Sequence, residues 1–304
     1  MESQVTRLVD KAWNKLLETP PDRRYMIAIG GIPGSGKSWL VLLFSCTHRK
    51  TNSLALFPPH QKGKTTLAKT VVDALNARHA TLDPSHPAHA TTPIAAFVPM
   101  DGFRTLISSS ISPFFHPPST PPDQTRPDLT PTLPSHPIDL TRAQLSAMPD
   151  PETAHARRGA EFTFDGAAYL SLIQALSTTT TTTATTVRAP SFDHAVKDPV
   201  PDDIAVEPWH RAVVLEGNYL CLDREPWRAA AALADERWFV EVGRDVARAR
   251  LAARHVRAGI VATLEDGLRR ADENDLPNGD EILQNRIPVD EVITSREDGS
   301  WVHE

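Results

Sequence analysis

The sequence predicts an α/β fold in three layers, with a parallel sheet of about five strands flanked by helices on both faces. Three features of the 304 residues support this prediction. Short apolar runs without internal charge recur along the chain, as in parallel strands buried on both faces. Stretches with apolar residues at helical spacing follow these runs, and a glycine-rich loop follows the first one. This alternation is typical of a parallel sheet covered by helices.

The elements can be assigned in order along the chain. Near the N-terminus, apolar residues between Val5 and Leu17 alternate with charges, which predicts an amphipathic helix on the flank of the domain. The predicted strands are Met26–Gly30, Ile94–Pro99, Ala212–Glu216 and Trp238–Val242. The predicted helices are residues 65–79, 166–176, 226–234, 244–258 and 263–271. We expect one domain over residues 1–304, with its core in 22–295.

Three stretches interrupt this pattern. Residues 38–64 join an apolar segment to one without helical period, and residues 104–139 hold nine of the 27 prolines. Residues 177–186 are almost all threonine, which predicts a low-complexity surface loop. The first two stretches each break a motif. They therefore fit either intron-like sequence retained in the reading frame or genuine lineage-specific loops.

The first predicted strand runs into GIPGSGKS (31–38), a full match to the phosphate-binding loop G-x-x-x-x-G-K-[ST]. Its glycines let the backbone approach an anion closely, and its N–H groups would face the phosphates. Lys37 would reach the β- and γ-phosphates, and the Ser38 hydroxyl would bind Mg²⁺. A glycine-rich turn that matches by chance is the alternative. The expected nucleotide-binding residues are Gly31, Ile32, Pro33, Gly34, Ser35, Gly36, Lys37 and Ser38.

A second copy of the end of this motif occurs at Gly63-Lys64-Thr65. Joining Lys37 to Thr65 gives GIPGSGKTTLAKTVVDAL, a continuous strand, loop and helix. Residues 38–64 therefore look inserted into the motif's own helix. Deleting them is expected to raise both stability and ATP affinity, with Thr65 as the Mg²⁺ hydroxyl.

Two carboxylates follow predicted strands. Asp101 comes after the run IAAFVPM, and Glu216 ends the run AVVLE. In an open α/β sheet, the carboxyl ends of the strands border the ligand crevice. A phosphoryl transferase needs carboxylates there, to bind Mg²⁺ and to accept a proton from the acceptor. Asp101 and Glu216 are therefore candidates for both roles.

At these residues the chain resembles the phosphoribulokinase/uridine kinase family of P-loop kinases, which includes the bacterial-type pantothenate kinases. It looks closest to a fungal and bacterial subgroup of kinase-like proteins of unsettled substrate. The resemblance is carried by GIPGSGKS (31–38), MDGF (100–103), RRGAEFTFD (157–165), APSFDHAVKDP (189–199), VVLEGNYL (213–220) and the arginine-rich helix at 244–258. Arg104 departs from the histidine or tyrosine usual after DGF, which bears on the acceptor pocket.

The resemblance implies a P-loop NTPase fold that uses ATP and Mg²⁺ to phosphorylate a hydroxyl of a small metabolite. A nucleoside, a pantothenate-like compound and a sugar all remain open as acceptors. It also implies that Asp101 is the catalytic base and that Glu216 assists Mg²⁺ and substrate.

Arginines on the helix after the fourth strand form a further candidate group. Arg250, Arg254 and Arg257 are spaced as one basic stripe. In related kinases, arginines of a lid helix close over the phosphates, and Arg250 and Arg254 are expected to act in this way. The alternative is a solvated face paired with Glu265 and Asp266.

The acceptor site is expected to use polar and aromatic residues from several loops. Arginine forks suit phosphate or carboxylate groups, which makes Arg157 and Arg158 candidates. Dense charge around an aromatic residue in the loop-like stretch 189–199 adds a second cluster. The candidate acceptor-binding residues are Arg157, Arg158, Phe164, Asp165, Asp193, His194, Asn218 and Tyr219.

Composition narrows the function classes. The net charge of -6 argues against general nucleic-acid binding, and two cysteines suggest a reducing, cytoplasmic location. We expect a small-molecule phosphoryl acceptor as partner, with no nucleic acid and no membrane; a homodimer is left open. The alternatives are an NTPase or nucleotide-binding switch without a small acceptor, and a catalytically impaired product that carries intron-like insertions.

Overall fold

The computed structural model describes residues 2–35, 63–82, 92–102, 142–179, 185–193, 198–295 and 301–303. Its α-helices are α1 (Glu2–Glu18), α2 (Lys64–Leu82), α4 (Arg142–Ser146), α5 (Pro151–Ala156), α6 (Gly166–Thr178), α7 (Trp227–Ala231), α8 (Arg244–Arg257), α9 (Leu264–Arg270) and α10 (Leu276–Gln284). Short helical turns lie at η1 (Met100–Gly102), η2 (Glu161–Thr163) and η3 (Ala271–Asp275), the last with π geometry.

The main sheet follows the order β2-β5-β1-β6-β7-β8. Its strands are β1 (Tyr25–Gly31), β2 (Ala95–Pro99), β5 (Ala212–Glu216), β6 (Glu236–Val242), β7 (Glu291–Ser295) and β8 (Trp301–His303). The first five are parallel, and β8 pairs antiparallel with β7 at the edge. The predicted parallel sheet of about five strands is confirmed, although β7 had not been assigned from the sequence.

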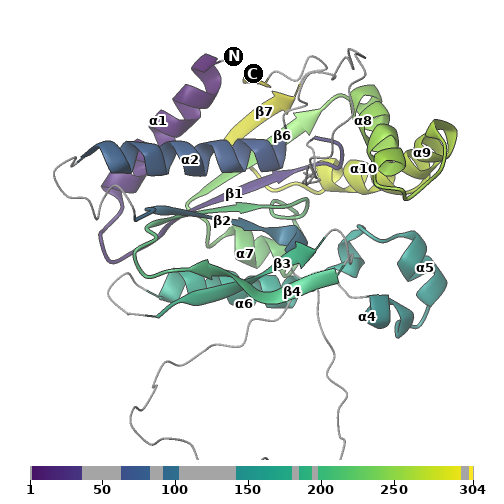
Figure 1. Ribbon diagram of the computed structural model, residues 1–304, viewed down its shortest axis with the longest axis horizontal. Helices are drawn as coiled ribbons and strands as arrows, with labels where there is room; N and C mark the ends of the chain where they lie inside the picture. Colours follow the sequence, from purple (N-terminus) through teal and green to yellow (C-terminus); the bar gives the residue numbers. More distant parts are fainter. Residues whose placement is uncertain are drawn as a thin grey trace, which may run out of the picture.

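Helices cover both faces of the sheet, which gives three layers (Figure 1). Alternate side chains of β1 separate into two cores, because successive side chains of a strand point to opposite faces. Tyr25, Ile27 and Ile29 pack with α1 and α2, whereas Met26 and Ala28 belong to the core under α6 and α7. The central strands are therefore buried on both faces, as their uninterrupted apolar runs predicted.

One predicted loop is wrong. Residues 189–199 were expected to be loop-like, but most of them belong to a hairpin of β3 (Val187–Asp193) and β4 (Asp198–Val206). The hairpin forms a separate two-stranded sheet that packs on η1. The prolines and aspartates of this segment do not predict strands, since these residues are depleted in ordinary sheets. Both strands lie at the edge of their sheet, where such residues are tolerated.

The interrupting stretches fall mostly outside the described residues. This applies to 36–62, 103–141 and 180–184. Helix α6 runs through Thr178, two residues beyond its predicted end and into the threonine-rich stretch, and helix α2 begins at Lys64, one residue before its predicted start.

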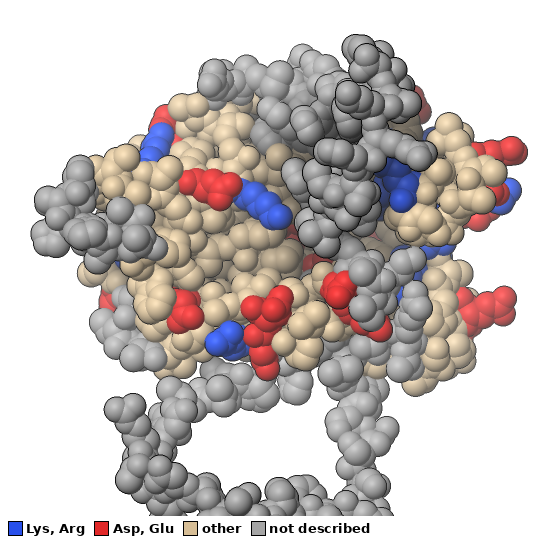
Figure 2. Space-filling model, in the orientation of Figure 1, with Lys and Arg blue, Asp and Glu red and all other residues tan. Residues whose placement is uncertain are grey.

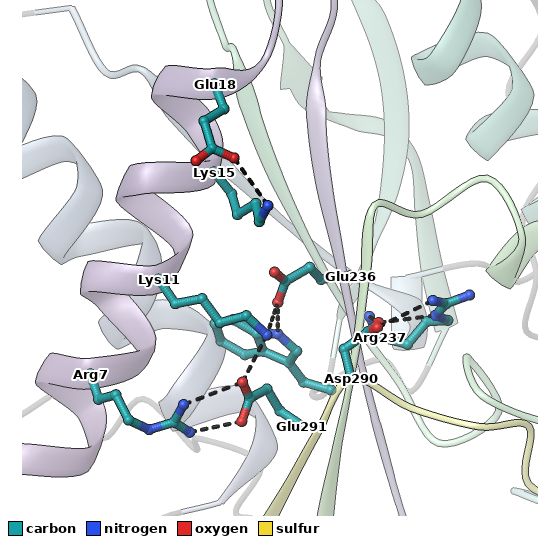
Figure 3. A network of polar contacts seen from close by, with 9 residues as sticks. Arg7, Lys11, Lys15, Glu18, Glu236, Arg237, Asp290 and Glu291 are labelled. Atoms are coloured by element: carbon teal, nitrogen blue, oxygen red, sulfur yellow. Dashed lines mark hydrogen bonds and ion pairs between the residues drawn. The ribbon is translucent and has the colours of Figure 1, made fainter.

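Helix α1 is held on the sheet by apolar contacts and by a buried ion network (Figure 3). Its residues Leu8, Ala12 and Leu16 are buried against α2 and the sheet, as the amphipathic pattern predicted. Lys11 bridges the carboxylates of Glu236 and Glu291, with N–O distances of 3.0 and 2.7 Å. This interaction ties the N-terminal helix to β6 and β7.

Candidate active site

The carboxyl ends of β1, β2 and β5 meet at one edge of the sheet, where open α/β folds bind their ligands. Strand β1 ends in the glycine-rich loop, β2 leads to Asp101 in η1, and β5 ends at Glu216. The pairing register places Glu216 beside both Ile29 of β1 and Pro99 of β2. The fold thus brings together three segments that are far apart in the sequence.

The loop after β1 closes tightly. The backbone N–H and the hydroxyl of Ser35 both donate to the carbonyl of Ile32, at 3.2 and 2.7 Å. Gly34 has φ +82, in the region that favours glycine, and an added Cβ would lie 3.0 Å from Ala247 of α8. A Cβ on Gly31 would lie 2.5 Å from the carbonyl oxygen of Val240. The two glycines are therefore required by packing as well as by the motif.

The lysine described in this loop is Lys64, from the second copy of the motif. Its ammonium donates to the side chain of Asn218 at 2.7 Å, and to the Ile32 carbonyl and the Ser35 hydroxyl at 3.3 Å each. Burial lowers the pKa of Lys64, while the nearby charge of Glu216 opposes this shift. Gly36, Lys37 and Ser38, which were predicted from the first copy, lie outside the described residues.

Thr65 and Glu216 lie directly beside this lysine. The Thr65 hydroxyl donates to Glu216 at 2.8 Å, and the Lys64 ammonium is 4.0 Å from the other carboxylate oxygen. Burial raises the pKa of Glu216 to about 7 despite the opposing charge of Lys64, and the charge of Asp101 adds to the rise. Asp101 itself is exposed. One carboxylate is thus buried and the other is open to solvent.

The donor set fits a magnesium ion. The Glu216 carboxylate is buried, that burial is the main cause of its raised pKa, and a hydroxyl oxygen lies next to it, so a bound cation would stabilise its charged form. Among the described residues, no group of three histidine, cysteine or acidic side chains could hold a metal by itself. Mg²⁺ in kinases needs fewer protein ligands, because water and substrate phosphates supply the others.

The three arginines of the predicted stripe on α8 differ in burial and in their partners. Arg250 is buried and donates to the Ser295 hydroxyl of β7 at 2.8 Å. Arg254 is partly exposed and lies 3.4 Å from Asp275, and its charge contributes to the lowered pKa of Lys64. Arg257 is exposed at the end of the helix. Of the three, Arg254 is the one whose charge influences the loop lysine Lys64.

Arg157 is fixed by the helical arm η3–α10. It donates to Asn274 at 3.0 Å and to Asn278 at 2.8 Å, and Asn274 in turn donates to the carbonyl of Arg158 at 3.3 Å. The role of these two asparagines in orienting Arg157 was not predicted from the sequence.

Several predicted acceptor residues have structural roles in the fold. Asp165 caps α6 by accepting from the Ala168 N–H at 2.9 Å. Tyr219 is fully buried, donates to the Gly159 carbonyl at 2.7 Å and packs edge-on against Phe164. Asp193 ends β3, and His194 lies outside the described residues.

No protein-family model matches the chain. The ATP-dependent kinase-like protein notR' of Aspergillus versicolor is 55% identical over 162 residues, which are 53% of this chain and 92% of the relative. The chain belongs to this family of kinase-like proteins.

For other relatives, the match covers a smaller share of the relative. A candidate uridine kinase of Schizosaccharomyces pombe is 43% identical over 150 residues, and the ATP-dependent kinase YFH7 of Kluyveromyces lactis is 33% identical over 189 residues. The matches cover 49% and 51% of this chain, but only 63% and 54% of the two relatives. The names of these relatives support a P-loop kinase.

Solved structures agree on the fold. YFH7 of Saccharomyces cerevisiae aligns with a TM-score of 0.68 and 21% identity, over 96% of this chain and 99% of its own. A candidate fructose transport system kinase of a Silicibacter species aligns with a TM-score of 0.60 and 24% identity, over 94% and 98%. At these identities the likeness shows the shared P-loop kinase fold alone.

Proposed function

We propose that the chain is an ATP-dependent kinase that transfers the γ-phosphoryl group to a hydroxyl of a small metabolite. The observation that carries this proposal is the pair of unlike carboxylates beside the phosphate loop. Glu216 is buried against a hydroxyl and an ammonium group, which suits a ligand of Mg²⁺. Asp101 is exposed, which suits a base that an acceptor can reach.

In this proposal the amides of the loop Gly31–Ser35 hold the β- and γ-phosphates. Glu216 helps to hold Mg²⁺, which when bound neutralises charge on the phosphates. Asp101 accepts the proton of the acceptor hydroxyl while the oxygen of that hydroxyl forms a bond to the γ-phosphorus. The bond between the γ-phosphorus and the bridging oxygen breaks, and ADP leaves with that oxygen. Arg254 stabilises the charge that develops during transfer.

On the face shown in Figure 2, the described lysines and arginines are scattered among acidic residues. No helix of the described part of the chain is long and apolar enough to cross a membrane. The relative named as a candidate uridine kinase favours a nucleoside, with pantothenate-like compounds and sugars as further acceptors to test.

The test is release of ADP from Mg-ATP with a panel of nucleosides, pantothenate and sugars, together with detection of the phosphorylated product by mass spectrometry. We expect ADP release to rise strongly with one acceptor class and that class to gain one phosphoryl group. ATP hydrolysis that no acceptor stimulates would replace the kinase proposal with an NTPase or switch.

A further inference from the structure

Two lysines of the chain are candidates for the phosphate-binding lysine of the loop. The continuous motif offers Lys37, and the second copy offers Lys64, 27 residues later. A lysine in this role must lie inside the loop and begin the helix that follows it. These requirements can be checked on the contacts of Lys64.

Lys64 meets both requirements. It is the first residue of the 19-residue helix α2, and only 6% of it is exposed. Its ammonium bonds to the Ile32 carbonyl and the Ser35 hydroxyl, both in the loop after β1. The loop is also shaped around its side chain, since a Cβ on Gly31 would lie 2.7 Å from Cδ of Lys64. The first glycine of the motif thus leaves room for this lysine.

Thr65 supports the same assignment. In a phosphate loop the hydroxyl residue directly follows the lysine and binds Mg²⁺. Thr65 follows Lys64, and its hydroxyl already donates to Glu216, the buried carboxylate. Asn218, two residues after Glu216, accepts from the Lys64 ammonium at 2.7 Å and orients it. Lysine, threonine and glutamate therefore form one connected group.

We propose that Gly63-Lys64-Thr65 completes the phosphate loop of this chain, with Lys64 as the phosphate-binding lysine and Thr65 as the hydroxyl ligand of Mg²⁺, in place of Lys37 and Ser38. The loop is then built from two segments, Gly31–Ser35 and Gly63–Thr65, that are separated in the sequence. This inference rests on the proposed function in that the ligand is Mg-ATP.

Three lysine variants test the assignment. Methionine keeps the apolar stem of lysine and removes the charge, so Lys64→Met, Lys37→Met and Lys15→Met form a matched set, with Lys15 as an exposed lysine of α1. Thermal melting with and without Mg-ATP and calorimetric titration give the readouts. We expect Lys64→Met to lose the ATP-induced rise in Tm and at least about tenfold in affinity. The other two should keep both.

The outcomes separate the two proposals. Loss of ATP binding by Lys37→Met, with binding kept by Lys64→Met, would overturn the assignment and leave the kinase proposal intact. A wild-type chain that binds neither ATP nor another nucleoside triphosphate would reject the proposed function itself. Thr65→Ala should weaken binding of Mg-ATP more than binding of ATP without Mg²⁺, and Thr65→Ser should restore the difference; equal effects would contradict the role of Thr65.

Lys37→Met keeps the inference testable if Lys64→Met does not fold, because loss of ATP binding by Lys37→Met would overturn the assignment. A deletion tests the joined loop itself. Removing 37–63 joins Gly36 to Lys64, and the resulting sequence is the same as that obtained by joining Lys37 to Thr65. The shortened chain should bind Mg-ATP at least as tightly as the full chain and melt at a higher temperature. A folded deletion variant that does not bind ATP would overturn the proposal.

Discussion

Replacing Lys11 with methionine should destabilise the protein far more than the same change at Lys15. Both lysines lie on α1, about one turn apart, and both make ion pairs (Figure 3). Lys11 bridges Glu236 and Glu291, whose side chains are each 6% exposed. Lys15 pairs with Glu18, and those two side chains are 52% and 66% exposed. The comparison therefore isolates the effect of burial.

The expected loss of folding free energy depends on the hydrogen-bond partners that Glu236 and Glu291 retain when Lys11 is removed. Without Lys11, Glu236 keeps the indole N–H of Trp238 at 2.6 Å, and Glu291 keeps Arg7 at 2.7 Å. Breaking a buried pair costs about 3–5 kcal/mol. Because Lys11 is itself 29% exposed, water can partly replace it, and we expect roughly 2–3 kcal/mol. For Lys15→Met the expected cost is below about 0.5 kcal/mol.

The pH dependence gives a second check. Burial favours the protonated form of Glu291, but hydrogen bonds from Arg7 and Lys11 outweigh it and lower its pKa from 4.5 to about 2. The folded pKa lies below the unfolded value, so this stability is present above about pH 4.5 and is lost as the pH falls toward 2. The penalty of Lys11→Met should therefore shrink at acid pH.

Urea unfolding of wild type, Lys11→Met and Lys15→Met, followed by circular dichroism from pH 7 down to the acid transition, measures these quantities. Equal free-energy losses for the two variants, or a Lys11→Met penalty that is independent of pH, would refute the reasoning from burial.

The remaining predictions concern the site. Asp101→Asn should reduce turnover by roughly 10²–10⁴-fold and change ATP affinity only a few fold; near-normal phosphorylation would exclude Asp101 as the base. Arg254→Ala should lower kcat more than ATP affinity, whereas Arg257→Ala, at an exposed position, should change neither; equal effects would point to a general loss of charge. The pKa of Glu216 is raised from 4.5 to about 7, so the ligand-free protein should lose stability as the pH rises toward 7. The rise in Tm caused by Mg-ATP should grow over the same range, and Glu216→Gln should remove both trends in thermal melts across pH.

The sequence by itself predicted four strands of the main sheet and the place of the candidate site. The apolar runs around Ile27 and Val214 predict buried strands. A strand that is covered on both faces needs apolar side chains at successive positions, and such a run can be recognised in the sequence alone. The glycine-rich loop and the acidic ends of two strands are also local features. Their meeting at one sheet edge follows from parallel pairing, so the positions of Asp101 and Glu216 could be inferred before the structure.

Only the tertiary structure supplied the contacts on which the assignment of Lys64 rests. Lys37 and Lys64 share a Gly-Lys-hydroxyl pattern in the sequence, and the contacts of Lys64 come from Ile32, Ser35 and Asn218, up to 154 residues away. The same holds for the arginines of α8, whose regular spacing does not reveal that one of them is buried against β7. It also holds for the ion network of α1, which joins residues about 280 positions apart. The physical reason is that burial and ionic partners are set by contacts between distant segments, whereas helical and strand periodicity is set by neighbours along the chain.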